Sequence, residues 1–104
     1  MNINEKDIYE IKLIGRSYIS HKRRLLEAER KVMNHSSFEI NCSKNIVDHI
    51  ETIVNDLNEK DRFIIENEVV NGKEGKWYLS YLSTSTYYRQ RKKAYRSFLN
   101  SLEN

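Results

Sequence analysis

No proline interrupts this chain, and glycine occurs only three times among its 104 residues. Turn-rich β architectures place both residues repeatedly at turns and strand ends. Inside a helix, proline costs about 3 kcal/mol and glycine about 1 kcal/mol relative to alanine. Long stretches without either residue therefore favour helices, and the sequence predicts an all-α fold.

A chain of this length usually forms one domain, and we expect a single compact domain with three parts. These are a long N-terminal helix over residues 1–34, a linker over 35–43 and a helical bundle over 44–104. The lone cysteine, Cys42, excludes an internal disulfide and fits a reducing, cytoplasmic location. No apolar run approaches the roughly 18–20 residues of a membrane span, so we expect no membrane partner.

The first helix begins with a choice of two caps, Asn4 or Asp7, and Gly15 weakens it without breaking it. Apolar residues then recur every seven positions, at Ile11, Tyr18, Leu25 and Val32. Such a row resembles a heptad seam. It either packs on the rest of its own domain, which we favour, or pairs with a second chain to form a homodimer.

The linker over 35–43 contains polar turn formers, and Phe38 and Ile40 are expected to pin it to the core. Ser43 or Asn45 then caps a second helix. Helical spacing of 4, 3 and 4 relates its apolar residues, Ile46, Ile50, Ile53 and Leu57.

A third helix is expected to begin after Asn58, because this residue is a suitable cap and acidic residues follow in the first turn. Asn71 and Gly72 are expected to end it, with Gly72 in the left-handed conformation common at helix ends. The same pair suits a β-hairpin turn, but the flanking residues do not alternate, and we reject that alternative.

Positive charge is concentrated in the last third of the chain. Residues 73–104 contain seven Lys or Arg and two Glu, a net charge of +5 within an overall charge of +3. We predict a short aromatic helix over 74–81, a tight Ser/Thr turn, and a long basic helix to about Leu102. One apolar stripe runs along that helix, through Tyr87, Ala94, Phe98 and Leu102. This is the layout of a helix-turn-helix, whose second helix enters the major groove of DNA.

The residues around this turn resemble a known family. They are Ser83, Thr86, Tyr87, Tyr88, Arg89, Lys92, Lys93 and Ala94, with a weaker match over 57–65. Together, covering about half of the chain, they resemble sigma-factor region 4-like regulators, closest to phage ArpU-type transcription regulators and small mollicute proteins. The resemblance implies a small helical bundle that ends in a helix-turn-helix with an extended basic C-terminal helix. It also implies a sequence-specific double-stranded DNA binder that acts on transcription.

The resemblance also implies roles for individual residues. Ser83 would cap the recognition helix, while Tyr87 and Ala94 would lie in the core. The expected DNA-binding residues are Thr84, Ser85, Thr86, Tyr88, Arg89, Lys92, Lys93 and Arg96. Hydroxyls and amides at a helix start reach phosphates, and arginine commonly reads guanine. The turn lacks glycine and is about one residue shorter than the common pattern, so the base-facing register stays open by one position.

Residue patterns typical of enzymes are not found. The sequence has no Gly-rich phosphate loop, G-x-S-x-G or H-E-x-x-H motif. Glu66 and Glu68 have a spacing that is common on any charged helix. His35, Cys42 and His49 do not match the paired short spacings of structural zinc sites. We therefore expect no enzyme activity, no metal and no cofactor.

Other binding functions stay open as alternatives. The chain would dock on RNA polymerase or a sigma factor without reading DNA, through a helix-in-groove contact of its N-terminal helix. Alternatively, its basic helix would bind structured RNA. Five tyrosines in the last third invite a stacking platform for single strands, but such platforms usually lie on sheets or OB folds. We therefore favour core or rim positions for these tyrosines.

Overall fold

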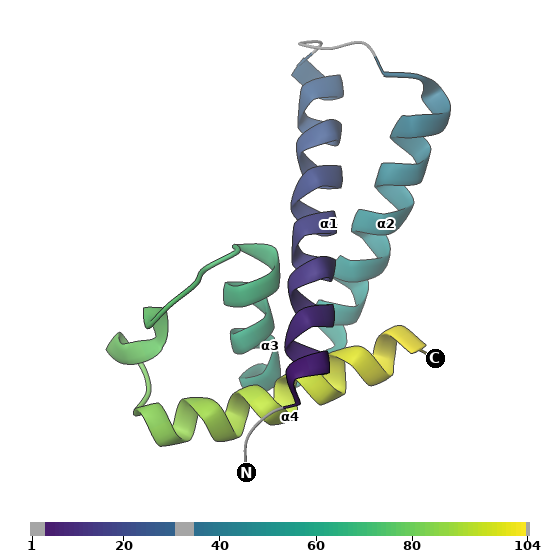
Figure 1. The fold of residues 1–104 in the computed structure, drawn as a ribbon. Coiled ribbons are helices and arrows are strands. Elements are labelled where there is room, and N and C mark those ends of the chain that lie inside the picture. The colour runs from purple at the N-terminus through teal and green to yellow at the C-terminus, as the bar shows by residue number, and fades with distance from the viewer. Residues whose placement is uncertain (1–3, 31–34, 104) are drawn as a thin grey trace.

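The computed structural model describes residues 4–30 and 35–103, and these two ranges form helices without a strand (Figure 1). In chain order the elements are α1 (Glu5–Arg30), α2 (Ser37–Asp56), α3 (Glu59–Ile65), the π-helical turn η1 (Glu66–Val70), the 3₁₀ turn η2 (Trp77–Ser80) and α4 (Thr84–Glu103). This confirms the predicted all-α fold, with a long N-terminal helix, a small helical bundle and a long basic helix at the C-terminal end.

The helices form an antiparallel two-helix hairpin and a third long helix that runs across one end of it, its foot. α1 and α2 lie antiparallel, and α4 crosses the foot of this hairpin, with α3 and η1 beside α1 and above the N-terminal half of α4 (Figure 1). The core lies where these elements converge. Its most completely buried large side chains come from α2, α3, η1 and α4, and are Val47, Ile64, Ile65, Val69 and Phe98. Burying each of them stabilises the fold by about 1.5–3 kcal/mol.

The seven-residue row of α1 faces the chain's own core. Ile11 and Tyr18 are both buried. The Tyr18 hydroxyl donates to the Glu51 carboxylate of α2 at 2.5 Å, and the Lys22 ammonium donates to the same carboxylate at 3.2 Å. These contacts join the two arms of the hairpin, as the favoured interpretation of the row requires. Val32 lies outside the described residues.

The linker expected over 35–43 is wrong, because α2 already begins there. Ser36 caps the helix, with its hydroxyl accepting from the backbone N–H of Glu39 at 3.1 Å. Helix caps and turns favour the same small polar residues, so the polar run was mistaken for a linker. Phe38 does not pin this segment to the core, since 77% of its surface is exposed.

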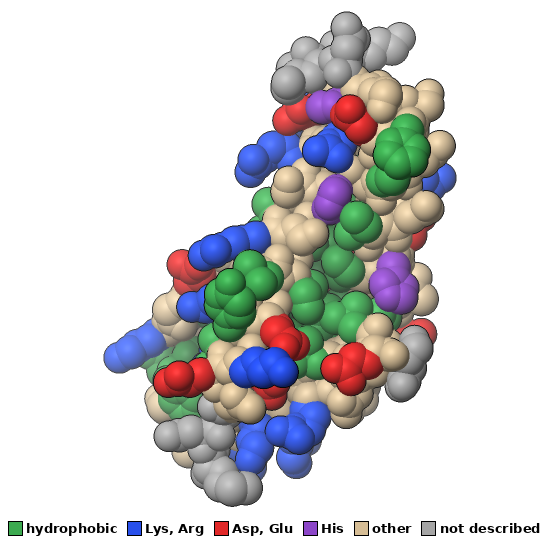
Figure 2. Space-filling view, turned by 45° about the vertical axis from the view of Figure 1, so that its right-hand side comes forward, with side chains coloured by type: hydrophobic (Ala, Val, Ile, Leu, Met, Phe, Trp, Pro, Cys, Tyr) green, Lys and Arg blue, Asp and Glu red, His purple; other side chains and the backbone are tan. Residues whose placement is uncertain are grey.

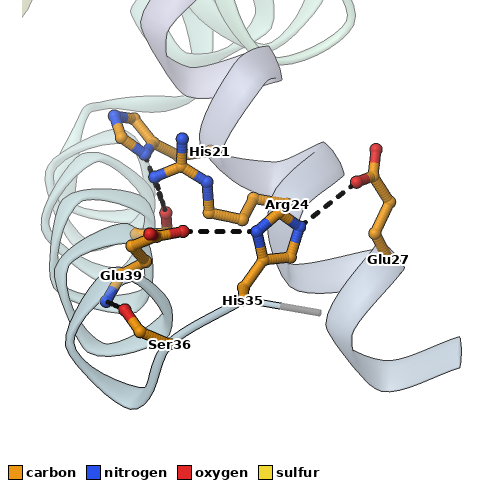
Figure 3. Close-up of polar contacts among 7 residues, drawn as sticks. His21, Arg24, Glu27, His35, Ser36 and Glu39 are labelled. Atoms are coloured by element: carbon orange, nitrogen blue, oxygen red, sulfur yellow. Dashed lines mark hydrogen bonds and ion pairs between the residues drawn. The ribbon is translucent and has the colours of Figure 1, made fainter. Parts of the chain in front are cut away.

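Ser43 is also misplaced as a cap, because it lies in the second turn of α2 and is fully buried. Its hydroxyl lies 2.9 Å from Nδ1 of His21 and accepts from the Arg24 guanidinium at 3.3 Å. The His35 ring lies between Glu27 of α1 and Glu39 of α2, with each ring nitrogen 3.3 Å from a carboxylate oxygen (Figure 3). Polar contacts therefore hold the upper part of the hairpin, where the core is thin.

The predicted start and end of the third helix are confirmed. The Asn58 side chain accepts from the backbone N–H of Asp61 at 2.9 Å, and Gly72 adopts a φ of 64°. Between them, the helix widens from α3 into the π-helical turn η1. Such turns contain one extra residue and are frequent at functional sites. The carboxylate of Asp61 also accepts from the Gln90 amide at 2.8 Å, which joins α3 to α4.

Candidate nucleic-acid interface

The long basic helix begins as predicted. The Ser83 hydroxyl accepts from the backbone N–H of Thr86 at 3.3 Å, and α4 starts at Thr84. This cap satisfies one of the free N–H groups at the helix start. The Ser83 hydroxyl itself donates to the Thr86 side chain at 2.9 Å, so the Thr86 hydroxyl is held by the cap.

One face of α4 is deeply buried. The buried residues of α4 are Tyr87, Ala94, Tyr95, Phe98 and Leu99. Tyr87, Ala94 and Phe98 form the inner face, and at 100° per residue Tyr95 and Leu99 fall on the edge of the helix that contains Tyr88 and Lys92. The predicted stripe is confirmed at Tyr87, Ala94 and Phe98, and Leu102 at its end is half-buried. Because so much apolar surface is buried, the helix cannot turn about its axis without losing core contacts.

The opposite face of α4 contains most of the predicted DNA-binding residues. We define this outer face by Ser85, Tyr88, Arg89, Lys92, Lys93 and Arg96. Lys92 is half-buried, and the other five residues are exposed. Their spacing of three and four residues places them on one side of the helix. Of the remaining two predicted residues, Thr84 is exposed in the first turn and Thr86 is half-buried.

The cations of the outer face form no ion pairs within the part of the chain that the structure describes. None of the ion pairs found there involves Arg89, Lys92, Lys93 or Arg96. The only acidic residue of α4 is Glu103, at the far end of the helix. In Figure 2, some of the Lys and Arg side chains lie at the bottom edge of the molecule, where α4 runs, and others are spread along its left side. The outer face thus presents four cations that form no ion pair among the described residues, although Glu59 and Asp61 line the same hollow as Lys93 and Arg96.

The short helix expected over 74–81 is largely absent. Only η2 forms, and the preceding Gly75 has a φ of 69°, a conformation that no α-helix contains. The spacing of Trp77, Tyr78 and Tyr81 also predicts that all three face inward, and this is wrong at Tyr81. Tyr78 is buried and Trp77 is half-buried, but 63% of Tyr81 is exposed. The element before α4 is therefore a single turn, shorter than the first helix of the predicted motif.

Aromatic rings fill the space between η2 and α4. The rings of Tyr78 and Tyr87 stack with centroids 3.7 Å apart and planes 4° apart. The Trp77 ring packs edge-on against the Tyr87 ring, with ring centroids 6.0 Å apart. The Tyr88 ring also packs against the Tyr87 ring, with centroids 5.1 Å apart. Such pairs contribute about 0.5–1.5 kcal/mol beyond burial. They hold the start of α4 in place even though η2 is short.

The carboxylate of Glu68 is the polar centre of this region. It accepts from the Trp77 indole N–H at 2.9 Å and from the hydroxyls of Tyr87 and Tyr95. Its side chain is only 9% exposed, and Nε of Arg91 lies 3.7 Å from it. Burial in the first place, and the neighbouring Glu68 carboxylate in the second, raise the pKa of both tyrosines far above the ordinary value.

Sequence reasoning missed this role of Glu68. Its spacing from Glu66 suggested a pair of surface acids, but Glu66 is exposed and Glu68 points inward. No local signal separates the two acids: Glu66 and Glu68 both lie between the apolar runs 63–65 and 69–70. Because the π-helical turn contains one extra residue, the side chains after Ile65 point in directions that the regular α-helical periodicity does not predict.

Comparisons with family models, with curated proteins and with solved structures give no match to this chain. The resemblance to region 4-like regulators therefore remains a prediction. Within the described residues, no helix is long and apolar enough to cross a bilayer, and no group of three or more metal-ligating side chains is found. The fold and surface define an all-α protein with a long basic helix exposed along one edge.

Proposed function

We propose that this protein binds double-stranded DNA by placing the outer face of α4 in the major groove. The observation that carries the proposal is the division of α4 into two faces. The inner face is locked into the core, and the outer face presents four cations that form no ion pair among the described residues. Cations clustered on one face of a helix are the electrostatic footprint of a nucleic-acid-binding protein.

The shape of the element supports this partner. An α-helix with its side chains is about 10–12 Å wide, and the major groove of B-DNA is about 12 Å wide. α4 crosses the foot of the hairpin, so its lower side is not covered by another helix of the described chain (Figure 1). The 20 residues of α4 span about 30 Å, enough to lie along a groove.

The proposal includes sequence-specific recognition and a role in transcription. Thr84, Ser85 and Tyr88 lie at the N-terminal end of α4, the part that contacts base edges in helix-turn-helix proteins. Arg89 follows them and is suited to read guanine or hold a phosphate. Tyr88 is half exposed and offers both a ring face and a hydroxyl.

The alternative is docking on a protein such as RNA polymerase or a sigma factor. It is favoured by the exposure of large apolar side chains along α1, at Tyr9, Leu13 and Leu26. A helix with such residues suits a helix-in-groove contact. The affinity of an apolar contact changes little with salt, whereas DNA affinity falls steeply.

Titration of fluorescent random-sequence duplex DNA at several salt concentrations tests the proposal. The test variant is Arg89→Gln/Lys93→Gln/Arg96→Gln, which removes three exposed cations from the outer face. The matched control is Arg23→Gln/Arg30→Gln/Lys44→Gln, which removes three exposed cations from the hairpin. Both variants change the net charge equally, so a difference between them reports position rather than total charge.

We expect wild-type affinity to fall with salt, with a log–log slope of roughly −4 if the four outer-face cations each neutralise a phosphate. The test variant should lose roughly 2 to 3 of that slope, and the control should retain it. Selection of bound sequences should then return a recurring motif. Absence of wild-type binding at low salt, or equal losses in both variants, would overturn the proposal.

A further inference from the structure

A second cationic surface adjoins the N-terminal half of α4. A cleft of about 510 Å³ lies between α1, the segment 72–76 and α4. Two carboxylates line it, those of Glu68 and Glu74. Five cations also line it, and they come from three separate parts of the chain: Lys12, Arg16, Lys73, Lys76 and Arg91.

The deepest of these charges is already balanced. Arg91 is mostly buried, and its guanidinium lies over the Tyr95 ring at 4.9 Å and the Tyr87 ring at 5.8 Å. Its partner is Glu68, whose carboxylate also accepts three hydrogen bonds. Because Arg91 and Glu68 balance each other, neither should attract a charged ligand strongly. The charge that can attract a ligand to the cleft therefore comes from the residues at its rim.

The rim is strongly positive. Lys12, Arg16, Lys73 and Lys76 are all exposed, and none of them forms an ion pair with another described residue. The Lys73 ammonium lies 5.9 Å from the centre of the ring of Trp77, a residue that does not itself line the cleft. Against these four cations the rim has one exposed carboxylate, Glu74. An anion is the complementary ligand.

The cleft is continuous with the outer face of α4. Tyr88 belongs to both, because it lines the cleft and is half exposed on the helix. Lys92 lies one turn further along the same side of α4. At 100° per residue, Lys93 falls on the opposite edge of the outer face from Tyr88. A helix in a major groove has one DNA strand on each side, and the cleft lies on the Tyr88 side.

We propose that this cleft holds backbone phosphates of the same DNA duplex that α4 enters, so that α1 and the segment 72–76 form a second contact with DNA. This inference rests on the proposed function. Lys12 and Arg16 are the α1 contacts, and Lys73 and Lys76 are the loop contacts. Their role is to position the duplex, because phosphate contacts set register and orientation without reading sequence.

The proposed cleft contact predicts a steeper dependence of DNA affinity on salt. The four cations of the outer face alone give a log–log salt slope of roughly −4, and four additional phosphate contacts raise it to roughly −7. The pairs Lys12→Gln/Arg16→Gln and Lys73→Gln/Lys76→Gln should each reduce the slope by about 2 and weaken binding about tenfold or more at 0.1 M salt. The matched control is Arg23→Gln/Lys44→Gln, which removes two exposed cations from the hairpin.

A length series of duplexes locates the contact. Wild-type protein should gain affinity once the duplex is long enough to reach the cleft, and the Lys12→Gln/Arg16→Gln protein should lack this step. On duplexes too short to reach the cleft, the two proteins should bind alike. Thermal unfolding checks that each variant is folded, which we expect because all substituted side chains are exposed.

The outcomes separate this inference from the function on which it rests. If the outer-face triple variant loses binding but both cleft pairs keep the wild-type slope at every length, the cleft contact is overturned and α4 recognition stands. If wild-type protein binds no DNA, both are overturned. A free phosphate compound is the alternative ligand of the cleft, and calorimetry with inorganic pyrophosphate tests for its binding. Pyrophosphate binding that needs Lys12 and Arg16, with an unchanged DNA slope, overturns the duplex contact and makes the cleft a small-anion site.

Discussion

The indole N–H of Trp77 donates a hydrogen bond of 2.9 Å to the carboxylate of Glu68, across the connection that contains Gly72 and Gly75. The same carboxylate accepts from Tyr87 and Tyr95 of α4. One buried acid thus joins η1, η2 and α4. The orientation of the proposed DNA-binding helix depends on this acid as well as on apolar packing.

Replacing Glu68 tests that dependence. Glu68→Ala leaves the donors of Trp77, Tyr87 and Tyr95 without their acceptor and the Arg91 guanidinium without its counter-ion. We expect a loss of about 3–5 kcal/mol in the free energy of unfolding. Glu68→Gln keeps one acceptor oxygen and should cost less. Urea unfolding measures both, and a change below about 0.5 kcal/mol for Glu68→Ala would contradict the arrangement.

Gly15 and Gly72 predict effects of opposite sign. At Gly15 an added Cβ would lie 3.7 Å from Val69, an ordinary contact, so Gly15→Ala should stabilise the fold by about 0.5–1 kcal/mol through helix propensity. At Gly72, φ is +64° and a Cβ would lie 3.0 Å from Ile19, so Gly72→Ala should destabilise by about 1 kcal/mol or more. Thermal unfolding of the two variants compares them directly.

Glu51 predicts a loss of stability in acid. The hydrogen bond from Tyr18, and then the Lys22 ammonium, hold the pKa of this carboxyl below its ordinary value in the folded state. Its contribution is therefore present above the pKa of the unfolded chain and is lost as pH falls through the folded-state value. The midpoint of urea unfolding should fall less between pH 7 and pH 3 in Glu51→Gln than in wild type. Equal falls in the two proteins would count against this coupling.

Tyr87 and Tyr95 predict a loss of stability at alkaline pH. Their pKa values are raised by burial and by the Glu68 carboxylate, so both stay protonated in the folded state when tyrosines of the unfolded chain ionise. Stability is then complete below about pH 10 and declines as pH rises above it. Thermal unfolding between pH 8 and 11 should show a shallower decline for Tyr87→Phe than for wild type. A decline as steep as that of wild type would show that the Tyr87 hydroxyl is not shielded.

Much of the proposed interface could be predicted from the sequence because the information is local. Ser83 as the cap, the buried stripe of α4 and the exposed positions of Arg89, Lys93 and Arg96 all follow from spacings within one helix. Lys12 and Arg16 were not part of that prediction. Their place beside α4 depends on how α1 crosses the bundle, which no spacing within α1 reveals.

The sequence by itself determined that this protein is helical, that Asn58 and Gly72 bound a helix, and which side of α4 is apolar. Each of these depends on contacts within about four residues along the chain. Only the tertiary structure decided that Glu68 and Ser43 are buried. Those outcomes depend on partners distant in sequence, since Glu68 meets Tyr95 and Ser43 meets His21 only after the helices pack.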